Sequence, residues 1–145
     1  IRESLKDGSV KTAGNLLGRN FTLKGRVVKG EGVGRTLGFP TANLTSENNI
    51  VIPNDGIYAT WCYFNDGITD KKMKSATSIG VRPTFGEGLR TVESYILDYD
   101  GDLYGKSMTL EFVDRIRDEI QYKSVSLLTE QMHVDVLDAS KILDN

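Results

Sequence analysis

The chain has 145 residues, a formal net charge of −2 and a pI near 5.4, so it suffices for one compact domain and lacks the broad basic face of a typical nucleic-acid binder. Hydrophobic residues make up 39% and charged residues 26%, which excludes the disordered and fibrous classes. No apolar stretch approaches the roughly 18 residues of a membrane span and no signal-peptide pattern opens the chain, so we expect a cytoplasmic protein that does not enter a membrane.

The first 19 residues read as a polar helical connector, and residues 20–145 read as the folded domain. The chain begins with Ile1 rather than methionine. We therefore expect it to be excised from a longer protein.

Short apolar runs between polar turns follow the connector. Residues Phe21 to Lys29 alternate apolar and polar side chains, which is the period of a half-buried strand. Further strands are expected at Ile57–Phe64, Lys74–Ile79, Val92–Tyr99 and Ser107–Val113. The pattern predicts five or six antiparallel strands in a small barrel. The single cysteine, Cys62, lies in one of these runs and is expected to be a buried thiol.

The end of the chain changes period. Apolar residues recur there at steps of three or four, which is typical of an amphipathic helix. They are Val125, Leu128, Met132, Val136, Ala139 and Leu143. Such a helix needs an apolar surface, and we expect it to lie on the outside or at the mouth of the barrel.

A glycine-rich segment runs from Gly30 to Leu44, too irregular for a helix or a strand. Its glycines at positions 30, 32 and 34 let backbone N–H groups approach phosphate oxygens, and Arg35 can add a positive charge. The segment runs into Phe39-Pro40-Thr41 instead of opening a helix, so it is not a dinucleotide-binding fingerprint. A flexible connection remains the alternative.

Thr41 and Asn43 follow Pro40 and lie two residues apart. In an extended backbone their oxygen-bearing side chains point the same way and can share one ligand. Mg²⁺ accepts such neutral oxygen ligands when substrate phosphates supply most of the negative charge. The alternative is that both residues only close a turn.

Glu93 shares a strand face with Tyr95, Leu97 and Tyr99, the more apolar of the two faces of that run. An acid in apolar surroundings is a candidate general base, and a hydroxyl acceptor of a phosphoryl group needs one. The alternative is a surface ion pair at the solvated end of the strand.

The charged tract Arg115-Ile116-Arg117-Asp118-Glu119, followed by Tyr122, is expected between the last strand and the helix. It offers hydrogen-bond donors, an acceptor and an aromatic surface to a planar ligand. A solvated run of charges is the alternative.

Taken in order, these segments resemble the riboflavin kinase family over residues 20–143. The resemblance rests on five stretches and the terminal helix. The stretches are GRVVKGEGVGRTLGFPTANL, GIYAT, SIGVRPTFG, VESYILDYDGDLYG and LEFVDRIRDE.

The resemblance implies a mainly β fold, a six-stranded antiparallel Greek-key barrel with the C-terminal helix packed beside it. It implies phosphorylation of the ribityl 5'-hydroxyl of riboflavin by ATP to give FMN and ADP, with Mg²⁺ or another divalent metal as cofactor. It also implies an FMN adenylyltransferase domain in cis, to which the connector at 1–19 would lead.

The resemblance further implies a role for individual residues. Glu93 is the expected catalytic base, and Thr41 and Asn43 are the expected metal ligands. The expected ATP contacts are Gly30, Gly32, Gly34, Arg35, Leu103 and Tyr104, and the expected flavin contacts are Arg117, Glu119 and Tyr122. Two other functions stay open: a barrel that binds FMN without making it, and a small oligonucleotide-binding barrel, which the acidic pI disfavours.

Overall fold

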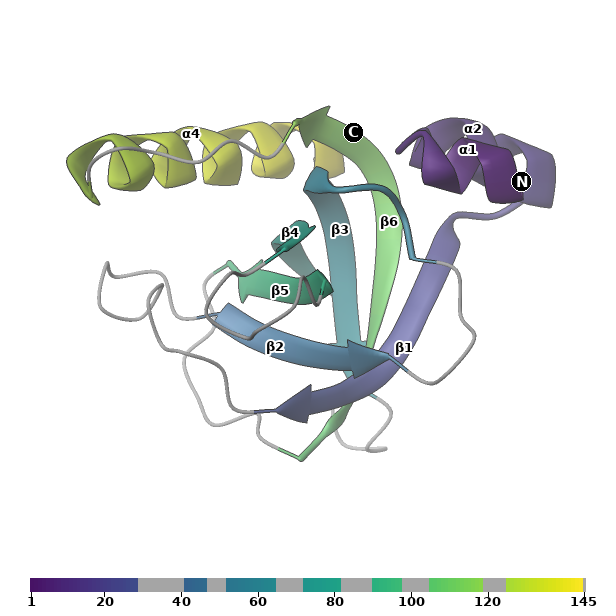
Figure 1. Cartoon of the computed structure of the whole chain (residues 1–145), viewed down its shortest axis with the longest axis horizontal. Coiled ribbons are helices and arrows are strands. Elements are labelled where there is room, and N and C mark those ends of the chain that lie inside the picture. Colours follow the sequence, from purple (N-terminus) through teal and green to yellow (C-terminus); the bar gives the residue numbers. More distant parts are fainter. Residues whose placement is uncertain are drawn as a thin grey trace.

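Antiparallel strands close into a barrel in the computed structural model, which describes residues 1–28, 41–46, 52–64, 72–81, 90–97, 105–118 and 125–144 (Figure 1). The strands are β1 (Phe21–Val28), β2 (Thr41–Ser46), β3 (Gly56–Phe64), β4 (Met73–Val81), β5 (Arg90–Ile96) and β6 (Ser107–Arg117). Their order around the barrel is β1-β2-β5-β4-β3-β6, and β6 returns beside β3 after the β3-β4-β5 meander. This is a Greek key, and it confirms the predicted fold class.

Most of the inside of the barrel is filled by apolar side chains, which alternate with outward-facing residues along the strands. Tyr58 on β3 and Phe112 on β6 meet edge to face, with ring centroids 5.4 Å apart. Cys62 is fully buried in the same core, as predicted, and burial raises the pKa of its thiol to about 12. The barrel is thus a packed core rather than a channel.

A chain of hydroxyl groups crosses this core from β3 to β5. Thr60 Oγ1 lies 2.6 Å from Ser75 Oγ and 2.7 Å from Thr77 Oγ1, and Thr77 Oγ1 lies 3.0 Å from Ser94 Oγ. All four side chains are fully buried. Because buried hydroxyls are costly unless they are hydrogen-bonded, this chain favours one register of β3, β4 and β5.

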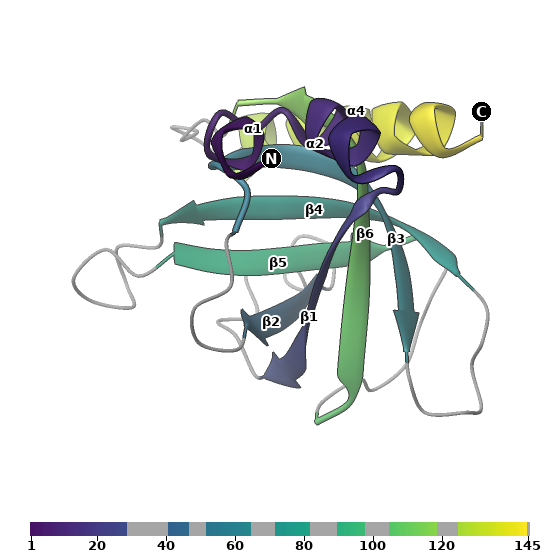
Figure 2. The same ribbon diagram turned by 90° about the vertical axis from the view of Figure 1, so that its right-hand side faces the viewer.

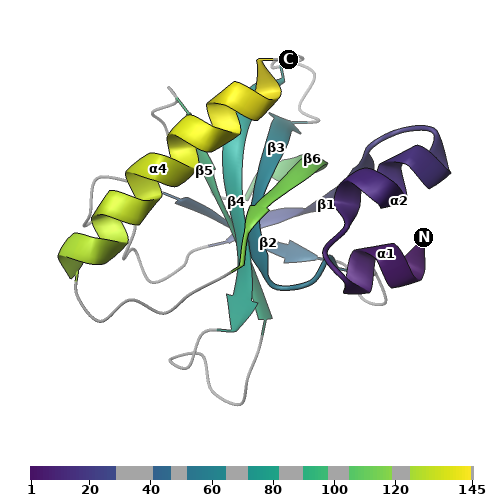
Figure 3. The same cartoon turned by 90° about the horizontal axis from the view of Figure 1, so that it is seen from above.

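The helices of the described residues lie around the upper side of the barrel in Figure 1, with β3 and β6 between them, and Figure 3 shows the same arrangement from above. Helices α1 (Arg2–Lys6) and α2 (Val10–Leu17) occupy the segment predicted as a helical connector. Figure 2 shows them beside the start of β1. Their residues Leu5, Val10 and Ala13 are buried in the same cluster as the barrel core.

Helix α4 (Val125–Leu143) lies across the outside of β3, β4 and β6. Ala139 and Leu143 are buried against Ala59, with Trp61 and Ile116 packed at the edge of this outer cluster. The predicted apolar stripe therefore packs on the barrel wall in the C-terminal half of the helix.

Two predicted boundaries are wrong. Residues Thr41–Ser46 form strand β2, although Gly30–Leu44 was predicted to contain no regular element. Strand β6 continues to Arg117, so Arg115 and Arg117 belong to the last strand and do not lie between it and the helix. The physical reason is the same in both cases: pairing with distant strands stabilises sequences whose local pattern is weak.

Candidate functional site

Asn43 and Glu93 lie directly opposite each other on the neighbouring strands β2 and β5. Directly opposed residues in an antiparallel pair have Cβ atoms roughly 4.5 to 5.5 Å apart on the same face of the sheet. Their neighbours Ala42, Leu44 and Val92 are buried in the core cluster, so Asn43 and Glu93 lie on the outer face. Both side chains are half-buried there.

The position of Glu93 corrects one premise of the sequence analysis. The face that Glu93 shares with Tyr95 was taken as the more apolar one. In the structure the opposite face is buried, with Val92, Ser94 and Ile96 inside the barrel. The misreading arose because Ser94 is polar by sequence but is buried through its hydrogen bond to Thr77.

Thr41 precedes Asn43 by two residues in β2 and pairs with Tyr95 of β5. Positions 41 and 43 therefore belong to one face of an extended strand, as the predicted shared ligand requires. The predicted base and the predicted metal-ligand positions lie on adjacent strands.

A row of paired residues extends from this point around the outside of the barrel. Glu93 pairs with Ser78 of β4, Ser78 with Ile57 of β3, and Ile57 with Arg117 of β6. We call the residues Asn43, Glu93, Ser78, Ile57 and Arg117 the outer row. Glu93 and Arg117 are separated by three strand spacings, or at most about 14 Å along the sheet.

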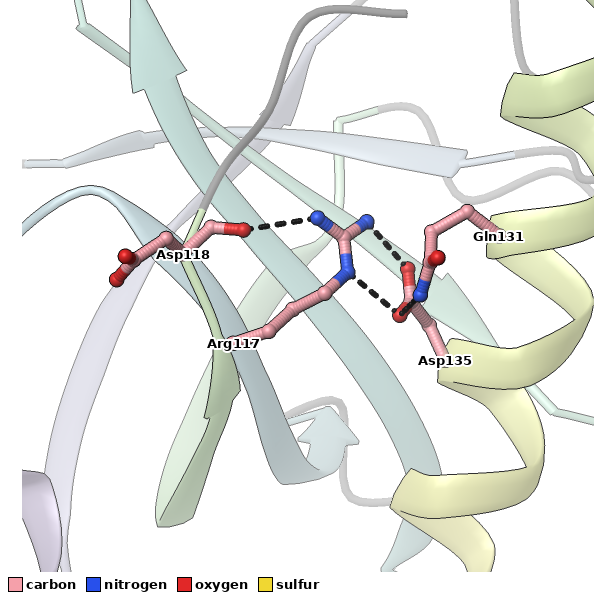
Figure 4. Close-up of polar contacts among 4 residues, drawn as sticks. All are labelled: Arg117, Asp118, Gln131 and Asp135. Carbon is pink, nitrogen blue, oxygen red and sulfur yellow. Dashed lines mark hydrogen bonds and ion pairs between the residues drawn. The ribbon is translucent and has the colours of Figure 1, made fainter.

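Arg117 ends this row and forms an ion pair with Asp135 of α4 (Figure 4). Nε of Arg117 donates to Oδ1 of Asp135 at 2.8 Å, and Nη2 donates to Oδ2 at 2.7 Å. This two-point geometry is the strongest form of an arginine–carboxylate contact. The predicted flavin contact of Arg117 remains a prediction.

Arg115, two residues earlier, is directed to other partners. Its Nη2 donates to the backbone oxygen of Asp55 at 2.7 Å, and its Nη1 lies 2.6 Å from Oδ1 of Asp118. Arg115 is therefore held to the residue before β3, while Arg117 is held to α4.

The remaining predicted site residues lie outside the described residues. They are Gly30, Gly32, Gly34, Arg35, Leu103, Tyr104, Glu119 and Tyr122. Their assignments to ATP and flavin stay predictions.

Asp135 was not predicted from the sequence as a site residue. It stands four residues before Ala139, at the spacing of the apolar stripe on α4, and it is buried. The sequence signal that could have identified Asp135 is an acidic residue inside an apolar stripe.

No helix within the described ranges combines the length and apolar character needed to cross a membrane. The described part of the chain contains no group of three or more histidine, cysteine or acidic residues able to hold a metal ion. A metal site built from Thr41 and Asn43 would instead use neutral oxygens and substrate phosphates.

Comparison with known proteins identifies relatives of this arrangement. The family model for flavokinase, described as riboflavin kinase, matches residues 17–143. The bifunctional riboflavin kinase/FMN adenylyltransferase of Bacillus subtilis (strain 168) is 34% identical over 148 residues, covering 100% of this chain and 46% of that protein. The protein of the same name from Escherichia coli (strain K12) is 36% identical, covering 96% and 43%. The chain thus spans less than half the length of these relatives.

Two solved structures share the fold. A macrolide-efflux protein from Streptococcus pneumoniae superposes with a TM-score of 0.84 and 36% identity, covering 92% of this chain and 43% of that one. Riboflavin kinase from Trypanosoma brucei superposes with a TM-score of 0.66 and 25% identity, covering 86% and 77%. The family match agrees with the second of these names. On the strength of that match, which covers most of its length, this chain belongs to the riboflavin kinase family.

Proposed function

We propose that this chain transfers the γ-phosphoryl group of ATP to the terminal ribityl hydroxyl of riboflavin, forming FMN and ADP. The observation that carries the proposal is the opposition of Asn43 and Glu93 across β2 and β5, within a chain of the riboflavin kinase family. Phosphoryl transfer requires an oriented acceptor and stabilisation of charge on the phosphoryl oxygens, and these two residue types suit the two tasks.

Glu93 is the proposed general base. Its carboxylate accepts a hydrogen bond from the ribityl hydroxyl, orients it toward the γ-phosphorus and takes its proton as the new P–O bond forms. The half-buried position supports this role, because it allows access to a substrate while limiting competition from water.

Thr41 and Asn43 are the proposed ligands of Mg²⁺ or another divalent cation. Their oxygen chemistry and their spacing on one extended strand fit a hard cation that takes most of its ligands from phosphates and water. When bound, the cation would neutralise charge on the phosphoryl oxygens. Asn43 itself would hold the ATP phosphates close to the hydroxyl that Glu93 orients.

The nucleotide and the flavin are proposed to occupy the segments next to this pair. ATP would contact Gly30, Gly32, Gly34 and Arg35 through its phosphates, and Leu103 and Tyr104 near the adenine. The flavin ring would lie at the segment that begins at Arg117 and includes Glu119 and Tyr122.

We also propose that the full-length protein is cytoplasmic and carries an FMN adenylyltransferase domain in cis. The second domain is supported by two relatives named bifunctional riboflavin kinase/FMN adenylyltransferase. Each is more than twice as long as the part that this chain matches. FMN made by one domain would be the substrate of the other.

The decisive experiment incubates the chain with riboflavin, ATP and Mg²⁺ and separates FMN from riboflavin by chromatography. We expect FMN in the wild type and a loss of kcat on the order of 10²- to 10⁴-fold in Glu93→Gln. Glu111→Gln, on the outer face of β6, is the matched control and should retain turnover.

Near-normal turnover in Glu93→Gln would refute the assignment of the base. Flavin binding without any ATP turnover by the wild type would instead favour a barrel that only holds FMN. Salt-dependent binding of single-stranded oligonucleotides without turnover would favour the oligonucleotide-binding alternative.

A further inference from the structure

The contacts of Arg117 with Asp135 and with the backbone of Asp118 together use all three nitrogen atoms of the guanidinium (Figure 4). Nε and Nη2 donate to the two oxygens of Asp135, while Nη1 donates to the backbone oxygen of Asp118 at 2.8 Å. Asp135 also accepts a hydrogen bond of 3.0 Å from Nε2 of Gln131, one turn earlier in α4. The side chains of Arg117 and Asp135 are only 19% and 7% exposed, so little water screens the pair.

This pair joins the barrel to the middle of α4. The C-terminal half is held separately, by burial of Ala139 and Leu143 and by an ion pair between Lys74 and Asp144. In the first turns of α4 the described side chains of Ser126, Leu127 and Glu130 are exposed. The contacts of Asp135 therefore help to orient the part of α4 that precedes Ala139.

The same pair also fixes the end of β6. Asp118 is held twice, through its backbone oxygen by Arg117 and through its carboxylate by Arg115. Arg115 is itself tied to the start of β3 through the backbone oxygen of Asp55. The chain thus leaves the barrel from a point anchored to both β3 and α4.

This anchored point belongs to the outer row that contains Glu93. Arg117, Ile57, Ser78 and Glu93 are successive partners across four strands. The Arg117 end of the row lies within reach of a flavin whose ribityl hydroxyl is at Glu93, because the two ends are at most about 14 Å apart along the sheet.

We propose that Arg117 and Asp135 are positioning residues for the flavin acceptor. Their ion pair sets where α4 and the end of β6 lie relative to Glu93, and so aligns the ribityl hydroxyl for attack. This inference rests on the proposed function. Three of the five guanidinium N–H groups already donate to protein oxygens, so the role assigned to Arg117 here is to position these elements, in addition to the flavin contact predicted from the family resemblance.

The test compares Asp135→Asn and Arg117→Lys with the wild type in steady-state kinetics and in titrations of riboflavin followed by its fluorescence. Asn keeps the shape of Asp without its charge, and Lys cannot make the two-point contact. We expect kcat/KM for riboflavin to fall and riboflavin affinity to weaken by about 10- to 100-fold, with KM for ATP changed by less than about twofold. The control is Lys72→Met, which removes the ion pair that Lys72 forms with Glu111 of β6. This variant should change neither kcat/KM for riboflavin nor riboflavin affinity.

A double variant, Arg117→Met with Asp135→Leu, separates positioning from stability. Removing both charges should restore much of the thermal stability lost in Arg117→Met alone, because no unpaired charge remains buried. Riboflavin affinity should stay weak in the double variant, since the directional contact is gone.

Each result decides between outcomes. Recovery of riboflavin affinity together with stability in the double variant would overturn the proposal, as would an equal rise in KM for ATP and riboflavin. If the wild type binds riboflavin but makes no FMN, the proposed function fails, and the binding titrations alone decide the positioning role. If the wild type does neither, both are abandoned.

Discussion

Asn43 of β2 and Glu93 of β5 are direct cross-strand partners on the outer face of the barrel. Under the proposed function these two residues would act on the two partners of one phosphoryl transfer, so their contributions to catalysis should not be independent.

We expect Asn43→Ala and Glu93→Gln to be strongly non-additive. Each variant should lower kcat, and the double variant should be little slower than Glu93→Gln, because residues that act as a unit lose their shared effect once. The measurement is kcat for the wild type, both single variants and the double variant at saturating riboflavin and ATP. If the reductions in kcat of the two single variants multiply in the double variant, the two residues act in separate steps.

Removing a proposed metal ligand should change the Mg²⁺ concentration that the reaction requires. We expect Thr41→Ala and Asn43→Ala to raise the Mg²⁺ concentration that gives half-maximal rate, on the order of tenfold. Titrating Mg²⁺ at fixed ATP measures it. Ser107→Ala, on β6, serves as the control. An unchanged magnesium dependence in both variants would contradict the metal assignment.

The buried hydroxyl chain predicts a loss of stability from a change that preserves shape. Thr77 is bonded to both Thr60 and Ser94, so Thr77→Val leaves two buried hydroxyls with one partner fewer. We expect the free energy of unfolding to fall by about 1 to 3 kcal/mol, measured by urea denaturation. Thr91→Val, on the same strand as Ser94, removes one half-buried contact of 3.3 Å to Gly80 and should cost less. Equal losses in the two variants would mean that the buried hydroxyl chain adds nothing to the free energy of unfolding.

Cys62 predicts a loss of stability at alkaline pH. Burial raises the pKa of its thiol from 9.0 to about 12, so the folded state keeps the proton that the unfolded state releases above pH 9. Its contribution to stability is complete below pH 9 and is lost as pH rises toward 12. The loss should reach about 1.4 kcal/mol by pH 10, one pKa unit above the unfolded value. Urea unfolding of the wild type and of Cys62→Val at pH 8 and pH 10 isolates this loss of stability. An equal change in the free energy of unfolding with pH in both proteins would contradict the prediction.

Gly8 and Gly18 form a matched pair at the connector. Both have positive φ, at 79° and 75°, so an added side chain is strained at either position. A Cβ at Gly8 would also lie 2.7 Å from Nε of Arg115 and 3.1 Å from the hydroxyl of Tyr58, whereas a Cβ at Gly18 would have no atom of the described residues within 4 Å. We expect Gly8→Ala to lower the free energy of unfolding by about 1 to 3 kcal/mol more than Gly18→Ala does. Equal losses would show that Arg115 moves aside freely.

The sequence predicted most of the barrel, because strands such as β1 and β3 carry their apolar residues at regular spacing. It failed at β2, where Thr41–Ser46 is held in the sheet by distant partners in β1 and β5. It ended β6 too early because Arg115 and Arg117 appear as solvent-exposed charges until Asp55 and Asp135 are brought beside them.

The same limit applies to the candidate site. Thr41, Asn43 and Glu93 were predicted from their own short stretches and from the family resemblance, but nothing in the sequence sets Asn43 opposite Glu93. Cross-strand register depends on the closure of the whole barrel, as does the burial of Ser94.

The pairing of β6 with both β1 and β3 has a consequence for biosynthesis. The barrel cannot close until Arg117 has left the ribosome, so the growing chain carries unpaired edges on β1 and β3 while the intervening strands are made. Folding that depends on such distant pairing is slow, in the range of milliseconds to seconds for small β domains. During translation, these two edges are where a chaperone would be needed most.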